Sequence, residues 1–311
     1  MPNSLQITTA KTAAVGVIVV TYRPDATKLK ALLAVLRPQV GAIVIVENTE
    51  ASEQKSFVSV LATDYACELI ELKENWGIAA AQNRGVQVLR QLPHIEYLLF
   101  LDQDSLPSST MVGALLAGFN KQVHAGHRVG AVGPNSFVAK LGTSIAFINI
   151  GFLGAQKIVC TTLDQAIATG HLISSGTLTS LVVFNEVGSF REDLFIDYVD
   201  VEWCLRAMRQ GYSLWGICAA TMEHDLGDEP IYVFGRPFFA HSPLRHYYLI
   251  RNGITLYKAS YISWRWKCSD APRLLRKSIF YLILSQPRLP QIRMMGKGFW
   301  DGLCGRLGKL R

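Results

Sequence analysis

The chain has 311 residues, half of them hydrophobic, and a formal net charge of +7. This length allows one large domain or two ordinary ones, and the apolar content is sufficient for a large core. No apolar run reaches the roughly 18 residues that span a bilayer, and the first fourteen residues lack the layout of a signal peptide. The six cysteines are scattered without a CxxC pair, which argues against a disulfide framework or a zinc site and predicts a reducing compartment.

Strands and helices are predicted to alternate from residue 15 to about residue 133, after a flexible N-terminus over 1–14. Apolar and β-branched runs predict buried strands at 15–20, 42–46, 69–72, 97–101 and 128–132. Helices are predicted after the cap candidates Asp25 and Thr27, over about 51–62, from the 75–85 segment to about 90, and after a cap at Ser108 or Ser109. This alternation predicts a mostly parallel central sheet flanked by helices.

The fourth predicted strand runs directly into Asp102-Gln103-Asp104. Open α/β sheets bind their ligands at the carboxyl ends of the strands. Two carboxylates with no neighbouring lysine or arginine repel each other, and Mg²⁺ or Mn²⁺ would offset that repulsion. Because Thr21-Tyr22 and Glu47-Asn48 end two other strands, this edge predicts a nucleotide site with a metal. The alternative for the two aspartates is a surface turn with solvated acids.

The second half of the chain is less regular. Loops and edge strands are predicted over 141–163, an apolar strand over 178–184, a helix from about 200 to 209, a strand over 213–218 and a tyrosine-rich helix over 241–257.

Acidic and histidine side chains gather in two loops of this half, at Asp197, Asp200 and Glu202, and at His224. Together with the first acidic pair, they fit a metal site plus a general base. The alternatives are an N-cap for Asp200, an ordinary loop histidine at 224, and a solvated Glu202 or its pairing with Arg206. The Asn75-Trp76-Gly77 segment could likewise be a helix cap.

In order, these motifs resemble those of inverting family 2 glycosyltransferases with the GT-A fold, most closely the bacterial rhamnosyltransferases. The resemblance covers about residues 15–257. The motifs are Thr21-Tyr22, the Asn75 to Gly85 segment, Leu101 to Ser105, Phe195 to Arg206, His224 with Gly227, and Arg251-Asn252. It implies a GT-A-type nucleotide-diphospho-sugar transferase fold over 15–257, with a nucleotide-binding half at 15–133 and an acceptor-binding half at 134–257.

The resemblance also implies roles for individual residues. Asp102 and Asp104 match the metal-binding DxD motif, with Asp104 the more direct ligand, and His224 completes the metal shell. Asp200 matches the catalytic base. The residues implied to line the nucleotide-sugar are Thr21, Tyr22, Glu47, Asn75, Gly77, Arg84, Asp102 and Gln103. The chain departs from the family at Glu47, where Asp is usual, and at Val199, where Glu often precedes the base.

The implied reaction moves L-rhamnose from dTDP-L-rhamnose to a hydroxyl of a growing, lipid-linked cell-surface polysaccharide such as O-antigen, at the cytoplasmic face of a bacterial membrane. A UDP-sugar is the alternative donor. A phosphotransferase of the haloacid-dehalogenase type also has a DxD motif, but it expects the motif on its first strand and Thr or Val where Leu106 stands. A non-catalytic membrane-associated subunit is a further alternative.

Residues 258–311 are predicted to form a basic, amphipathic helical tail. From Tyr261 onward the chain has 11 Lys and Arg and 2 Asp and Glu, a balance of +9, whereas the other residues balance at −2. Tryptophan and apolar side chains interleave with the basic ones, which is typical of segments that lie on anionic membranes. Homo-oligomer formation and packing over the catalytic domain are the alternatives. Nucleic acid is not expected, because no binding module accompanies the charge.

Overall fold

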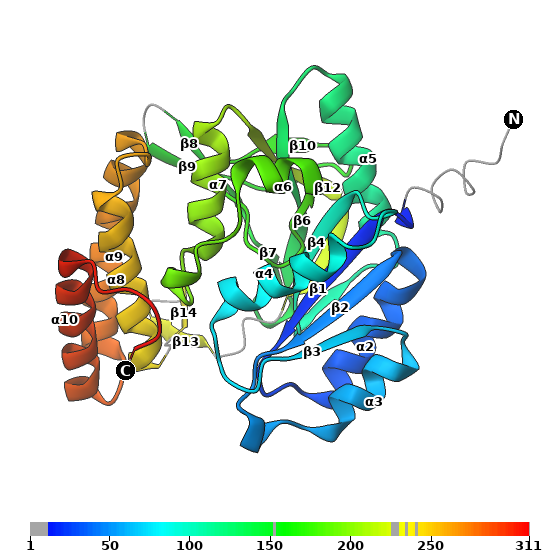
Figure 1. The fold of residues 1–311 in the computed structure, drawn as a ribbon. Coiled ribbons are helices and arrows are strands. Elements are labelled where there is room, and N and C mark those ends of the chain that lie inside the picture. Colours follow the sequence, from blue (N-terminus) through cyan, green and yellow to red (C-terminus); the bar gives the residue numbers. More distant parts are fainter. Residues whose placement is uncertain (1–11, 152–153, 225–229, 234–235, 240–241, 311) are drawn as a thin grey trace, which may run out of the picture.

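A ten-stranded sheet forms the centre of the protein, with helices on both of its faces (Figure 1). The computed structural model describes residues 12–151, 154–224, 230–233, 236–239 and 242–310. The strand order is β10-β12-β6-β11-β4-β1-β2-β3, with β5 paired to β12 and β7 paired to β6. Predictions for residues 1–11 and for Gly227 lie outside the described residues.

The first half of the chain alternates as predicted. Its elements are β1 (Val15–Thr21), α2 (Ala26–Leu36), β2 (Ala42–Glu47), α3 (Ser56–Asp64), β3 (Glu68–Glu71), α4 (Ile78–Leu89), β4 (Tyr97–Asp102), β5 (Ser105–Pro107), α5 (Met111–His124) and β6 (Val129–Val138). Asp25 caps α2 by accepting a hydrogen bond from the Lys28 N–H at 2.9 Å. Two helices begin later than predicted. The helix predicted over about 51–62 begins only at Ser56, after a 3₁₀ turn at Ala51–Glu53. The N-cap residue of α5 is Thr110, where Ser108 or Ser109 was predicted.

The strands β1, β2, β3 and β4 are parallel, which confirms the predicted sheet. Thr21 lies in register with Glu47, and Val20 lies in register with Asp102, so the polar strand ends converge at one edge. Alternate residues of β1 face opposite layers. Ile18 packs in a core with α4, α6 and α7, whereas Val17 packs in a core with α2, α3 and α5. Burial on both faces explains the continuous apolar runs of these strands.

The second half adds antiparallel strands and more helices. Its elements are β7 (Thr143–Ser144), β8 (Phe147–Gly151), β9 (Gly154–Ile158), β10 (Ala166–Ala168), β11 (Leu178–Ser180), α6 (Leu181–Val187), α7 (Val199–Arg209), β12 (Ser213–His224), β13 (Pro230–Val233), β14 (Arg236–Phe239), α8 (Pro243–Lys258), α9 (Trp264–Leu284) and α10 (Arg288–Cys304). The strand β11 lies between β4 and β6 and is antiparallel to both.

The predicted strand over 178–184 is wrong after its third residue. The Ser180 hydroxyl accepts a hydrogen bond from the Val183 N–H at 3.2 Å, and this cap starts α6 at Leu181. The buried side chains of α6 are Val183, Phe184 and Val187, a helical spacing that a short apolar run does not distinguish from a strand.

The expectation of six reduced cysteines is also wrong, because Cys160 and Cys218 form a disulfide. The segment before β10 runs along β12, where the Cys218 N–H donates to the Gln165 carbonyl at 3.1 Å. This brings the two Cα atoms to 5.6 Å across 58 residues of sequence. The free cysteines are Cys67, Cys204, Cys268 and Cys304.

The last three helices form a layer beside the sheet, at the left of Figure 1. The helix α10 lies against α8 at two glycines. A Cβ at Gly298 would lie 2.5 Å from the Tyr247 carbonyl oxygen, and one at Gly302 would lie 2.8 Å from the Arg251 carbonyl oxygen. Part of the predicted tail is therefore packed on the preceding domain. Within the described ranges, no helix combines the length and the apolar character that crossing a bilayer requires.

Candidate active site

The acidic pair lies where β4 meets β5: Asp102 is the last residue of β4, and Asp104 lies in the turn that leads to Ser105. The backbone of Ser105, which follows Asp104, pairs with that of His224 at the end of β12, so the fold brings the predicted metal-binding segments side by side. The Asp102 N–H donates to the Ser175 hydroxyl at 3.1 Å. That hydroxyl also lies 2.6 Å from the Ser105 hydroxyl. The turn is therefore fixed by a buried serine from a distant loop.

Glu47 is directed inward at the end of β2, with 2% of its surface exposed. Its Oε2 accepts from the Thr21 hydroxyl at 2.8 Å, and its Oε1 accepts from the Thr49 N–H at 3.1 Å and from the Thr49 hydroxyl. Both carboxylate oxygens are thus engaged within the protein. Glu47 holds the ends of β1 and β2 in place.

Tyr22 and Gln103 join the loop after β1 to the acidic turn. The Tyr22 N–H donates to Gln103 Oε1 at 2.7 Å, and Gln103 Nε2 donates back to the Tyr22 carbonyl at 3.0 Å. The Tyr22 ring is partly exposed. The glutamine between the two aspartates therefore fixes the loop at the predicted nucleotide edge.

The segment before α4 is built around two asparagines. Asn48 Oδ1 accepts from the Trp76 N–H at 2.8 Å, and Asn48 Nδ2 donates to Asn75 Oδ1 at 3.3 Å. Asn75 Oδ1 also accepts from the Gly77 N–H at 2.9 Å. The Arg84 guanidinium lies over the Trp76 ring, 5.9 Å from its centroid. The predicted nucleotide residues Asn75 and Gly77 thus lie at the start of α4, and Arg84, from the middle of that helix, contacts Trp76 between them.

Gly77 is the N-cap residue of α4 and has a φ of +85°. A Cβ at this position would lie 2.5 Å from the Phe195 carbonyl oxygen. That carbonyl accepts a hydrogen bond from the Ile78 N–H at 2.8 Å. Gly77 therefore caps the helix, and the cap joins the predicted nucleotide edge to the segment that precedes α7.

Asp200 is the second residue of α7, and the N-cap residue is Tyr198, so the N-cap alternative for Asp200 is wrong. Its Oδ1 accepts from the Val201 N–H at 2.8 Å, and its Oδ2 accepts from the Ser174 N–H at 3.1 Å. Burial raises the pKa of the Asp200 carboxyl above its ordinary value, and these two N–H groups oppose the rise. Phe100 and Trp203 line the same small cavity as Asp200, which explains the desolvation. A raised pKa suits a general base.

Sequence reasoning did not identify Ser174 and Ser175 as site residues. Ser174 donates its N–H to Asp200, and Ser175 accepts from the Asp102 N–H, so adjacent residues contact both acidic sites. Gln82 of α4 also donates to the Ser174 hydroxyl. The sequence offered one signal for this loop, the two serines directly before Gly176, a glycine that has a φ of +86°.

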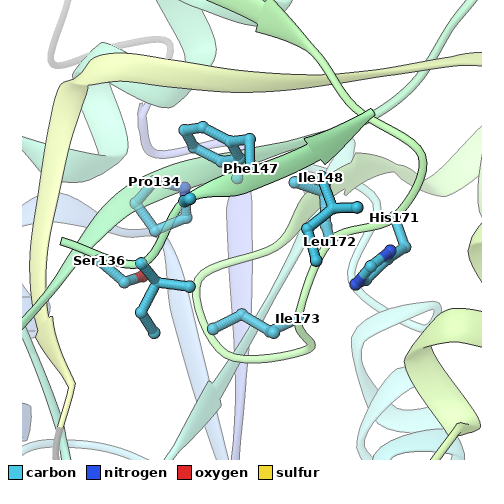
Figure 2. Close-up of a pocket in the computed structure, with 10 residues that line it drawn as sticks. Pro134, Ser136, Phe147, Ile148, His171, Leu172 and Ile173 are labelled. Atoms are coloured by element: carbon cyan, nitrogen blue, oxygen red, sulfur yellow. The ribbon is translucent and has the colours of Figure 1, made fainter. Parts of the chain in front are cut away.

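A pocket of about 80 Å³ lies beside this serine loop (Figure 2). The labelled residues that line it are Pro134, Ser136, Phe147, Ile148, His171, Leu172 and Ile173. His171 Nδ1 is buried and has no hydrogen-bond partner among the described residues. Burial, reinforced by the positive charge of Arg273 and opposed by Asp270, lowers the pKa of His171 to about 4. The histidine is therefore neutral at pH 7.

The remaining acids of the α7 region serve structural contacts. Glu202 pairs with Arg206 as expected, with two N–O distances of 3.0 Å, but it is fully buried and not solvated. It also accepts from the Tyr261 hydroxyl at 2.8 Å. Asp197 forms an ion pair with Arg245, in which Asp197 Oδ1 lies 3.4 Å from Arg245 Nε.

The side chains at the β4 edge determine whether a metal ion can bind there. Among the described residues, no three His, Cys, Asp or Glu side chains are grouped closely enough to hold a metal ion. The acidic turn nevertheless offers the carboxylates of Asp102 and Asp104, with the His224 backbone beside it. Carboxylate oxygens are ligands that Mg²⁺ and Mn²⁺ accept, with water completing the shell. The two carboxylates of the turn therefore fit a divalent metal.

Comparison with known proteins agrees with this geometry. No protein-family model matches the chain. The dTDP-rhamnosyl transferase RfbF of Shigella flexneri is 32% identical over 246 residues, which cover 79% of this chain and 80% of that protein.

Solved structures show the same fold. GalNAc-T7, crystallised with UDP, GalNAc and Mn²⁺, superimposes with a TM-score of 0.59 at 13% identity, over 94% of this chain and 56% of that one. TarS of S. aureus superimposes with a TM-score of 0.55 at 14% identity, over 91% of this chain and 48% of that one. The chain thus spans about half the length of these two proteins. By its fold and its similarity to RfbF, the chain belongs to the GT-A glycosyltransferases of the dTDP-rhamnosyl transferase family.

Proposed function

We propose that this glycosyltransferase is a metal-dependent, inverting rhamnosyltransferase in which Asp200 is the catalytic base. Asp200 takes the proton from an acceptor hydroxyl, and the hydroxyl oxygen attacks the anomeric carbon from the face opposite the diphosphate. The bond between that carbon and the phosphate oxygen breaks, and the diphosphate leaves. The observation that carries this proposal is a pair of hydrogen bonds, from the Ser174 N–H to the Asp200 carboxylate and from the Asp102 N–H to the Ser175 hydroxyl, which connects the proposed base to the acidic turn.

The acidic turn is the proposed site for Mg²⁺ or Mn²⁺, held by Asp102, Asp104 and His224. When bound, the ion would neutralise charge on the leaving diphosphate. The donor is proposed to be dTDP-L-rhamnose, because the similar protein RfbF is named a dTDP-rhamnosyl transferase. A UDP-sugar is the alternative, since a TarS structure of the same fold contains UDP-GlcNAc. Thr21, Tyr22, Glu47, Asn75, Gly77, Arg84, Asp102 and Gln103 are proposed to form or support the donor site.

Residues 134–257 are proposed to bind the acceptor, and the pocket in Figure 2 is favourably placed for it. Its lining residues His171 to Ile173 lead directly into Ser174, which bonds Asp200. The acceptor would be a lipid-linked saccharide of a growing cell-surface polymer such as O-antigen.

The test combines binding and turnover. Calorimetry with dTDP and with UDP, each with and without Mn²⁺, should give metal-dependent binding that favours dTDP. Asp200→Asn should lower kcat by about 100-fold or more while dTDP binding persists. Asp64→Asn, an exposed change on α3, is the matched control and should retain full activity. Activity of Asp200→Asn equal to the control would remove the base assignment, and phosphate release without sugar transfer would favour the phosphotransferase alternative.

The basic tail is proposed to bind an anionic membrane at the cytoplasmic face of the cell. The helices α9 and α10 each expose an apolar stripe, at Leu275, Ile279 and Ile283 and at Leu289, Ile292, Phe299 and Trp300; Trp264 is 76% exposed. Arginines and lysines carry the +9 balance of this region. Exposed apolar side chains among basic ones match a bilayer with anionic headgroups.

Vesicle sedimentation tests the membrane proposal. The protein should bind vesicles that contain phosphatidylglycerol, and it should bind phosphatidylcholine vesicles weakly. The double variant Arg276→Glu/Arg293→Glu should lose this preference, and Lys30→Glu/Lys55→Glu, with the same charge change at exposed sites elsewhere, should keep it. A dimer in light scattering combined with no vesicle binding would assign the stripes to a second copy of the chain.

A further inference from the structure

The turn that leads into α7 has an unusual backbone. Phe195, Asp197 and Tyr198 have φ values of +67°, +61° and +62°. Side chains other than glycine rarely adopt this left-handed region, and they persist there when the surrounding structure holds them. Asp200 follows Tyr198 by two residues, so this turn determines where the carboxylate lies.

Asn252 of α8 holds the turn from inside the protein. Its side chain is fully buried, and its Nδ2 lies 2.9 Å from the carbonyl oxygen of Leu194, 2.7 Å from that of Ile196 and 2.9 Å from that of Asp197, so that these three acceptors share its two hydrogens. One amide group thus contacts nearly every peptide of the turn.

Arg251 extends this contact on the other side. Its guanidinium is fully buried; Nε donates to Asn252 Oδ1 at 2.9 Å and Nη2 donates to the Leu194 carbonyl at 2.8 Å. Nη1 donates to the Gly308 carbonyl at 2.5 Å, and the Gly308 N–H donates to the Asp193 carbonyl at 2.7 Å. A buried cation is costly unless it is fully hydrogen-bonded, so the C-terminal segment completes its environment.

We propose that Arg251 and Asn252 are positioning residues which, with Gly308, hold the 194–198 turn so that Asp200 meets the acceptor hydroxyl. This inference rests on the proposed role of Asp200 as the base. The same turn accepts the Ile78 N–H of α4 at the Phe195 carbonyl. The contact residues do not touch the reacting atoms, and they act through the backbone of the turn.

Asn252→Ala tests the inference against a matched control. Gln39→Ala removes another buried amide, which bonds the carbonyls of Val35 and Ser108 and the N–H of Val112, none of which belongs to the 194–198 turn. Both variants should lower Tm. Only Asn252→Ala should lower kcat, by about tenfold to 100-fold, with the Kd for dTDP unchanged, because a shift of about 1 Å in a catalytic group has that effect. The acidic limb of the pH–rate profile of Asn252→Ala should also move, because a displaced turn changes the burial of the Asp200 carboxyl.

Gly308→Pro provides a second variant outside both main cores. Proline removes the N–H that bonds Asp193 and cannot adopt the φ of +87° at this position. Like Asn252→Ala, this variant should lower kcat, and the protein should still fold. Wild-type kcat and pH profile in both Asn252→Ala and Gly308→Pro would overturn the inference. If Asp200→Asn is inactive in that case, the base assignment stands and only the positioning role fails.

Discussion

The neutral His171, whose Nδ1 is buried, should make the protein lose stability in mild acid. The pKa of His171 falls from 6.5 to about 4 in the folded protein. Between these values the unfolded chain binds a proton that the folded protein does not bind. The histidine therefore favours unfolding progressively as the pH falls from about 6.5 towards about 4.

The size of the effect follows from the shift in pKa. Each pKa unit corresponds to about 1.4 kcal/mol, so the acid-induced loss from His171 amounts to about 3 kcal/mol. His171→Gln removes the titrating group and should reduce the loss of unfolding free energy between pH 7.5 and pH 4 by about this amount. Asp200 acts in the opposite direction, because burial raises its pKa, but its contribution is the same in both proteins and cancels in the comparison.

Urea denaturation at a series of pH values measures this difference. His94→Gln, which changes an exposed histidine, is the control and should follow the wild-type curve. A wild-type pH dependence in His171→Gln would refute the reasoning, because it would mean that the imidazole is solvated or hydrogen-bonded in solution.

Three further predictions concern the active site. Ser175→Ala removes the hydroxyl that accepts from the Asp102 N–H, and it should cost about 1–3 kcal/mol of stability in urea. It should also weaken Mn²⁺-dependent dTDP binding in calorimetry, and unchanged binding would contradict the fixed turn. Gly77→Ala places a Cβ 2.5 Å from the Phe195 carbonyl at a φ of +85°, so kcat and Tm should both fall, and a wild-type Tm would show that the cap can relax. Because the base must be ionised and burial raises the pKa of Asp200, the pH–rate profile should rise with pH through a limb that lies above the ordinary range of an aspartate. A limb within or below that ordinary range would contradict the burial of the carboxyl.

The sequence was sufficient to predict the sheet edge that forms the site. Apolar runs buried on both faces identify β1, β2 and β4, and parallel pairing then brings Thr21, Glu47 and Asp102 together. The polar strand ends carry the chemistry, so their position follows from the predicted topology. The direction of the Glu47 side chain did not follow, because it depends on hydroxyl donors from two other positions.

The contacts that the sequence did not reveal are all between distant segments. The link from Ser174 to Asp200 spans 26 residues and the link from Asn252 to Leu194 spans 58, and neither has a local periodicity. The Cys160–Cys218 bridge depends on a strand pairing that the spacing of the cysteines does not encode. The start of α6 at Leu181 is different, because it depends on the local Ser180 cap, and a short apolar run does not distinguish a helix from a strand.

The place of β11 between β4 and β6 affects how this protein can be synthesised. During translation β1, β2 and β4 emerge early, but the strand that covers the open side of β4 is Leu178–Ser180, which emerges much later. Until then the nascent chain has an apolar edge that can pair with other chains. Pairing across such a sequence separation is slow to form. Chaperone retention on the ribosome, or aggregation of fragments that end near residue 133, is therefore the expected cost of this topology.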